Sequence, residues 1–188
     1  GTGSDTVLSQ IAAEELCTQT DQFIVISSDT DVTPFDVGAY ASSTTYLTGA
    51  AVQECAFKVK EQILARASMI LGADVGALKC EEGHVVARDG RKVSFGEVCV
   101  HALYEDEQHQ IAAHASKISQ VSPPPFAAHF AEVEVDTELG NVKVVNYVAA
   151  VDCGVAIHPK LAEGQAEGAI LNGISYALVE EYIFNERG

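Results

Sequence analysis

Apolar residues at helical spacing predict a first helix that begins at the capping residue Ser4. These apolar residues are Val7, Leu8, Ile11, Ala12 and Leu16. A short apolar run, Phe23–Ile26, predicts a strand, and a polar loop of about nineteen residues, Ser27–Thr45, follows it. Because loops of this length are uncommon without a role, this loop is a candidate functional segment. The longest helix is expected over Tyr46–Leu71, with one apolar stripe.

The middle of the chain has the pattern of a hairpin followed by a capped helix. Residues 83–94 alternate around the turn dipeptide Asp89-Gly90 and predict two paired strands. Ser94 and Glu97 form a capping-box pattern for a helix that reaches about Tyr104. A further strand is expected over Ile111–Ile118.

The last third of the chain predicts a second hairpin and a final helix. Pro123–Pro125 marks its border, because three prolines fit neither a central strand nor a helix. Phe130–Val135 and Val142–Val148 alternate as strands, and a helix is expected over about Leu161–Glu181. The order of elements predicts an α+β fold in which helices pack on a mixed sheet in two layers.

Two parts are expected along the chain. Residues 1–122 form a first part with a satellite hairpin near 77–94, and residues 123–188 form a second part with a hairpin and a glycine-containing helix. The chain opens directly into a helix without methionine and ends soon after Tyr182–Phe184. We therefore expect it to be a piece of a larger polypeptide.

The composition limits the ligands and the compartment. Twenty-seven acidic and eleven basic residues give a formal net charge of −16, which disfavours nucleic acids and anionic membrane surfaces. A phosphate ligand would have to be held mainly by backbone amides. Five widely spaced cysteines without a Cys-x-x-Cys pair are expected to be reduced, mostly buried thiols. Without a long apolar run or a signal peptide, the expected location is cytoplasmic.

The final helix has an unusual cost. Gly164, Gly168 and Gly173 each sacrifice roughly 1 kcal/mol of helix stability relative to alanine. One interpretation is tight packing on a neighbouring element. The other is a ligand that lies against the opening turn and faces Gln165, whose amide offers two donors and two acceptors.

A second candidate binding segment precedes the long helix. Ala41–Thr45 places small, mostly hydroxylated residues at a helix N-terminus, which suits an anion, although ordinary N-capping is the alternative interpretation. Asp29, Asp31 and Asp36 do not have the spacing of a calcium loop, and the histidines lack paired ligand spacing, so no metal site is expected. A Gly-x-Ser-x-Gly elbow and a Walker loop are both absent from the sequence.

Four blocks of the sequence together resemble the large subunit of the xanthine dehydrogenase and aldehyde oxidoreductase family, the molybdenum hydroxylases. The blocks are Gly3–Leu16, Asp29–Gly49, Phe130–Asp136 and Asp152–Gly168. The resemblance implies a C-terminal fragment of a molybdopterin-binding subunit with a two-layer cofactor-binding domain. The cofactor would be a molybdenum-pterin, either molybdopterin or its cytosine dinucleotide.

The resemblance also implies site residues. Ala41, Ser42, Ser43, Thr44 and Thr45 would hold the pterin and its phosphate or nucleotide tail, and Gln165 would hydrogen-bond the cofactor. Thr2 stands where the family often has the glutamine of a Gly-Gln-Gly motif, so a shorter hydroxyl would replace that contact.

The implied parent enzyme is an oxidoreductase that hydroxylates an aldehyde or an N-heterocycle with water as the oxygen source. Its iron–sulfur clusters and FAD would lie on partner subunits or domains, and its substrate would be a small molecule. The family's general base is a glutamate in a Gly-Glu-Pro-Pro-like segment expected beyond the glycine-containing helix, so no catalytic residue is assigned in this chain and the isolated chain is expected to be inactive. Two alternatives stay open: a hydroxybenzoyl-thioester reductase-like enzyme with the same cofactor, and a non-catalytic cofactor-binding or subunit-interaction module.

Overall fold

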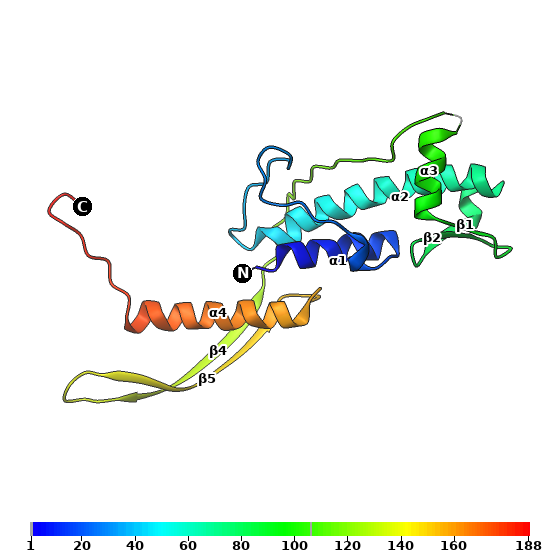
Figure 1. The fold of residues 1–188 in the computed structure, drawn as a ribbon. Helices are drawn as coiled ribbons and strands as arrows, with labels where there is room; N and C mark the ends of the chain where they lie inside the picture. The colour runs from blue at the N-terminus through cyan, green and yellow to red at the C-terminus, as the bar shows by residue number, and fades with distance from the viewer. Residues whose placement is uncertain (1, 106) are drawn as a thin grey trace. The chain divides into compact units, whose positions relative to one another are not determined.

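The computed structural model describes residues 2–105 and 107–188 and divides the chain into two compact units, Gly3–Gln120 and Val121–Gly188 (Figure 1). The predicted α+β class is confirmed. The described strands are all antiparallel and form two separate sheets, of three and two strands, in place of the expected mixed sheet. Sequence periodicity identifies strands but does not say which strands pair or in which direction, so it could not distinguish one mixed sheet from two antiparallel sheets.

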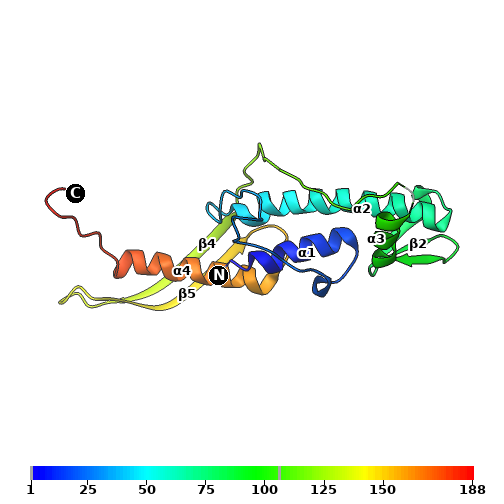
Figure 2. The same ribbon diagram turned by 45° about the horizontal axis from the view of Figure 1, so that its top comes forward.

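The first unit begins with a pair of neighbouring helices, α1 (Ser4–Leu16) and α2 (Gly49–Leu71), which lie side by side (Figures 1 and 2). A Cβ atom at Gly49 would lie 2.8 Å from Cδ1 of Ile11, so the glycine allows the helices to approach closely. Lys60 Nζ pairs with Glu15 Oε1 at 3.2 Å across the same contact. The expected cap at Ser4 is wrong, because Gly3 is the N-cap and Ser4 is already helical.

The core of the first unit lies where α2 meets a three-stranded sheet and α3 (Phe95–Tyr104) (Figure 2). The sheet has the order β1 (Leu78–Glu81), β2 (His84–Ala87) and β3 (Lys92–Ser94). The expected hairpin is present as β2 and β3, and the capping box of Ser94 and Glu97 is present at the start of α3. The buried cluster consists of Ile63, Ala67, Leu71, Cys80, Val85, Ala87, Val93 and Val98.

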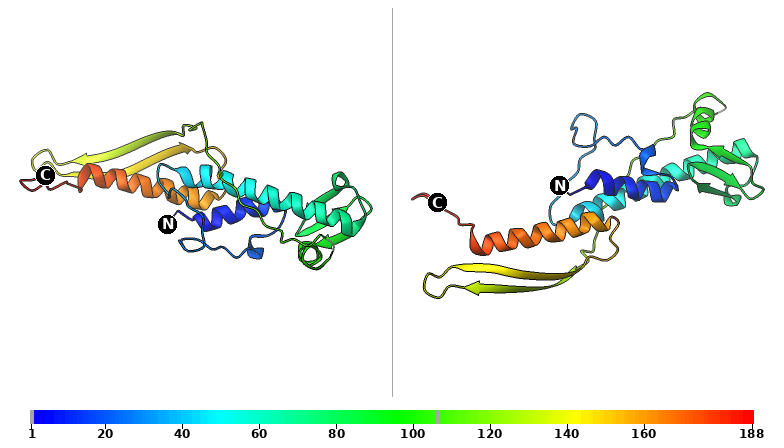
Figure 3. Two further views of the ribbon diagram at one scale, coloured as in Figure 1. Left: turned by 90° about the horizontal axis from the view of Figure 1, so that it is seen from above. Right: turned by 60° about the horizontal axis from the view of Figure 1, so that its bottom comes forward.

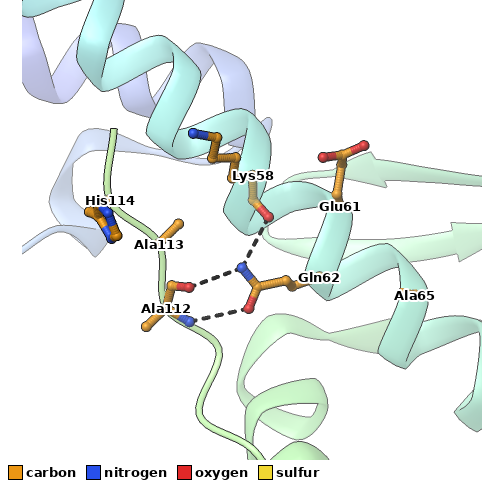
Figure 4. A pocket seen from close by; sticks show the side chains of 7 residues that line it. All are labelled: Lys58, Glu61, Gln62, Ala65, Ala112, Ala113 and His114. Carbon is orange, nitrogen blue, oxygen red and sulfur yellow. Dashed lines mark hydrogen bonds between the residues drawn. The ribbon is translucent and has the colours of Figure 1, made fainter. Parts of the chain in front are cut away.

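Two expected strands of the first unit are not strands. Phe23–Ile26 is irregular, and the side chain of Ile24 is 94% exposed. The segment 111–118 is also irregular and is held along α2 by side chains, since the amide of Gln62 donates to Ala112 O at 3.0 Å and accepts from Ala112 N at 3.3 Å (Figure 4). An apolar run favours extended backbone, but a strand needs a ladder partner, and no described strand pairs with either segment.

The second unit contains a long antiparallel hairpin followed by one helix (Figure 3). β4 (Phe126–Val135) and β5 (Val142–Asp152) extend beyond the predicted strands and pair with one irregularity beside Glu132/Val133. Their residues are exposed or half-exposed throughout. Helix α4 (Pro159–Leu178) begins at a proline in its first turn and ends before the expected Glu181.

The cysteines of both units are free thiols. Only Cys80 is buried, and burial raises the pKa of its thiol, whereas Cys153 is exposed. The expectation of mostly buried thiols is therefore wrong, because Cys17, Cys55 and Cys99 lie at half-buried positions. Among the described residues, every helix is too short or too polar to cross a membrane.

Candidate functional site

The loop before α2 ends in an uncommon backbone conformation. Ala41 and Ser42 have positive φ angles of 52° and 56°, and η2 (Thr44–Thr48) then forms a single π-helical turn that leads into α2. A left-handed conformation costs a residue with a Cβ atom roughly 1–2 kcal/mol. Since π turns are rare and strained backbone gathers at ligand-binding sites, this helix start is the candidate site.

Hydrogen bonds hold the loop in this conformation. The carboxylate of Asp36 accepts from Gly38 N at 2.8 Å and from Thr48 Oγ1 at 2.7 Å. These bonds, first that of Thr48 and then that of Gly38, hold the pKa of Asp36 below its ordinary value. Ser43 Oγ donates to Gly38 O at 3.2 Å, and Gly38 has a φ of 102°, a conformation that favours glycine.

The donors of Ala41–Thr45 differ in availability. The hydroxyl of Ser43 is used within the loop, whereas Ser42 and Thr45 are exposed and Thr44 is half-buried. No side chain caps the N–H groups that open η2, and the segment 27–45 contains no lysine or arginine. We call the backbone N–H groups and hydroxyls of Ala41–Thr45 the cradle, because they are candidate donors to an anionic, oxygen-rich ligand.

The other predicted binding residues lie elsewhere in the sequence. Thr2 is exposed immediately before α1, and Gln165 is exposed on α4. The ring of His158 accepts at Nδ1 from Leu161 N at 3.2 Å and caps the start of α4. The first unit therefore carries the cradle, and the second unit carries Gln165.

The three glycines of α4 are not explained by packing inside the second unit. A Cβ atom built at Gly164, Gly168 or Gly173 would meet no heavy atom within 4 Å. The packing interpretation thus requires a neighbour outside the second unit, and the ligand interpretation is compatible with this open surface.

A hollow on the first unit lies away from the cradle. It is open and is lined by residues of α2 and of the segment beside it (Figure 4). The lining residues are Lys58, Glu61, Gln62, Ala65, Ala112, Ala113 and His114. Figure 4 shows Gln62 bridging to Ala112, so this hollow is a structural contact that contains none of the predicted site residues.

Two residues with a role in the cradle were not found as such from sequence. The sequence pattern suggests for Asp36 only a role as a metal ligand, and it suggests no role for Thr48. Among residues 2–105 and 107–188, no group of three or more His, Cys, Asp or Glu side chains could hold a metal ion. The Asp-x-Gly spacing at Asp36 is a weak signal of the turn, but a contact to a residue twelve positions later leaves no local pattern.

Known proteins match the whole chain. A family model described as the molybdopterin cofactor-binding domain matches residues 1–188. The sequence is 36% identical over 188 residues to the probable hypoxanthine oxidase XdhD of Escherichia coli, covering 100% of this chain and 20% of that protein. It is 35% identical over 192 residues to a xanthine dehydrogenase molybdenum-binding subunit of Escherichia coli, covering 100% of this chain and 26% of that subunit.

A solved structure has the same fold. The crystal structure of quinoline 2-oxidoreductase from Pseudomonas putida 86 matches with a TM-score of 0.85 and 29% identity. The match covers 99% of this chain and 25% of that chain. The chain thus spans about a fifth to a quarter of the length of the proteins that it resembles.

Proposed function

Because the chain belongs to the molybdopterin cofactor-binding domain family of xanthine dehydrogenase-like oxidoreductases, we propose that it holds the pterin through Ala41–Thr45 and Gln165. The observation that carries this assignment is the strained start of η2, where two left-handed residues precede an uncapped π turn. The N–H groups at this helix start have no side-chain cap and are available to a ligand. The residues fit the cofactor, because its phosphate needs hydrogen-bond donors and the cradle supplies them. The nearby carboxylate of Asp36 already accepts hydrogen bonds from Gly38 N and Thr48 Oγ1.

The predicted residues divide into direct contacts and support. Ser42, Thr44 and Thr45 donate from hydroxyls, and the backbone amides at the start of η2 donate along the helix axis. The hydroxyl of Ser43 donates to Gly38 O, so this residue supports the loop and its hydroxyl does not bind the cofactor. Gln165 offers an amide that matches the mixed donors and acceptors of a pterin edge, and Thr2 offers one further hydroxyl.

Bound molybdopterin supplies two-electron redox chemistry at molybdenum. The residues of this chain bind and orient the cofactor. By analogy with the family, we place the general base outside these 188 residues and expect the isolated chain not to turn over substrate.

The larger protein hydroxylates a small N-heterocycle with water as the oxygen source. The names of three matching proteins support this substrate class, because hypoxanthine, xanthine and quinoline are all N-heterocycles, although carbon monoxide dehydrogenases match as well. Iron–sulfur clusters and FAD lie on partner subunits or domains, and the cofactor is molybdopterin or its cytosine dinucleotide. The net charge of −16 argues against nucleic-acid or anionic membrane partners, and we place the protein in the cytoplasm.

The test is the cofactor content of the 188-residue chain purified from a host that makes molybdopterin. Molybdenum is measured by mass spectrometry and pterin by fluorescence after oxidation. Ser42→Ala and Gln165→Ala each remove a hydrogen bond to a polar or charged ligand and are expected to weaken retention about tenfold to a hundredfold. Ser116→Ala and Gln53→Ala alter exposed residues of the same types outside the site and are the matched controls. Equal retention in all four variants would refute the assignment.

A further inference from the structure

Asp36 connects the two ends of the cradle. Its Oδ1 accepts from Gly38 N at 2.8 Å, before the left-handed pair of Ala41 and Ser42. Its Oδ2 accepts from Thr48 Oγ1 at 2.7 Å, at the last residue of η2. One carboxylate therefore bonds to a residue twelve positions along the chain, and the segment Asp36–Thr48 contains every residue of the cradle.

Further hydrogen bonds tighten the same segment. Tyr40 N donates to Gly38 O at 3.1 Å, Ser43 N donates to Tyr40 O at 3.1 Å, and Ser43 Oγ donates to Gly38 O at 3.2 Å. These bonds depend on where Gly38 lies, and Gly38 is held by Asp36. Because two left-handed residues are unfavourable in a free loop, an external restraint is needed to keep them in place.

We propose that Asp36 is a positioning residue that fixes the turn at Ala41–Thr45 for the cofactor, an inference that rests on the proposed function. A carboxylate beside an anion-binding cradle would repel the ligand, so its presence needs a compensating role. Both oxygens of Asp36 face donors of its own loop and helix, which gives it that role. The neighbouring Asp29 makes a similar short turn, with its Oδ1 accepting from Asp31 N at 3.0 Å, but no described hydrogen bond joins its carboxylate to η2 or α2.

The experiment compares Asp36→Ala and Thr48→Val with the matched control Asp29→Ala in the 188-residue chain. The first readout is hydrogen exchange at the amides of Gly38, Tyr40 and Ser43, which report the turn without any cofactor. Loss of the restraint is expected to speed exchange about tenfold or more in the first two variants and not in the control. Exchange in α3 checks that the rest of the first unit stays folded.

The second readout is molybdopterin retention with the conservative variants included. Asp36→Asn can still accept from Gly38 N and can donate to Thr48 Oγ1, and Thr48→Ser keeps the hydroxyl, so both are expected to restore retention and slow exchange. Unchanged exchange in Asp36→Ala, or an equal increase in Asp29→Ala, would overturn the positioning role. Faster exchange with full cofactor retention would overturn it as well. If the unaltered chain retains no pterin, the proposed function fails, while the exchange comparison still decides whether Asp36 fixes the turn.

Discussion

Replacing glycine by alanine in α4 separates the two explanations for its glycines. At Gly164 and Gly168 a new Cβ atom meets no heavy atom of the second unit within 4 Å, so the substitution creates no clash within that unit. The helix then gains the propensity difference of about 0.8–1 kcal/mol for each site. At room temperature this difference slows local opening of the helix about fourfold to fivefold.

The assay is hydrogen exchange of the amides of α4 in Gly168→Ala, with Ala169→Gly as the control at the next position of the same helix. Exchange is expected to slow in Gly168→Ala and to speed up by a similar factor in Ala169→Gly, which carries the opposite change in helix propensity. Cofactor retention in Gly168→Ala is expected to fall, because the added methyl group occupies the surface that the ligand approaches. Faster exchange in Gly168→Ala would refute the reasoning, since it would mean that the chain itself packs against the glycine. Slower exchange with full cofactor retention would refute the ligand interpretation alone.

Two further predictions concern the first unit. Val98→Ala removes two fully buried methyl groups and should lower the unfolding free energy by about 2–3 kcal/mol. Val100→Ala, on the same helix but 57% exposed, should change it by less than about 0.5 kcal/mol. Urea titration followed by circular dichroism measures both variants, and equal shifts would contradict the assigned core. The carboxylate of Glu97 accepts hydrogen bonds from Ser94 Oγ and Ser94 N, and these bonds lower its pKa below the ordinary 4.5. The stabilisation of α3 by Glu97 should therefore be complete above pH 4.5 and should be lost as the pH falls through the lowered pKa. The difference in helix content between the unaltered chain and Glu97→Gln should therefore shrink on acidification, and a difference that grows towards low pH would reverse the assignment.

The sequence predicted best what depends on neighbouring residues. The end of α2 at Leu71, the capping box at Ser94 and the hairpin around Asp89-Gly90 each rest on a local pattern, and the structure confirms all three. The family was also recognisable from ordered blocks of sequence, and the family-model match over residues 1–188 confirms it. These features need no knowledge of distant contacts.

The features that sequence could not predict depend on partners far along the chain. Phe23–Ile26 has the composition of a strand, but composition does not supply the second strand that a ladder requires. Ala41 and Ser42 carry Cβ atoms, so nothing in their identity signals a left-handed backbone. The bond between Asp36 and Thr48 joins two ordinary residues whose proximity exists only after the loop has closed.

Under the proposed function, the strained loop holds an anion without the help of basic side chains. A lysine or arginine could reach a phosphate from a flexible loop, because its long side chain adapts to the ligand. The segment 27–45 has neither, so the donors in the cradle are N–H groups and short hydroxyls whose directions are set by the backbone. Such donors bind well only if the backbone is fixed before the ligand arrives. Here the fixed backbone contains two left-handed residues and a π turn, which need a restraint to maintain them. A carboxylate with two donors of its own can provide the restraint without leaving an uncompensated charge beside the ligand.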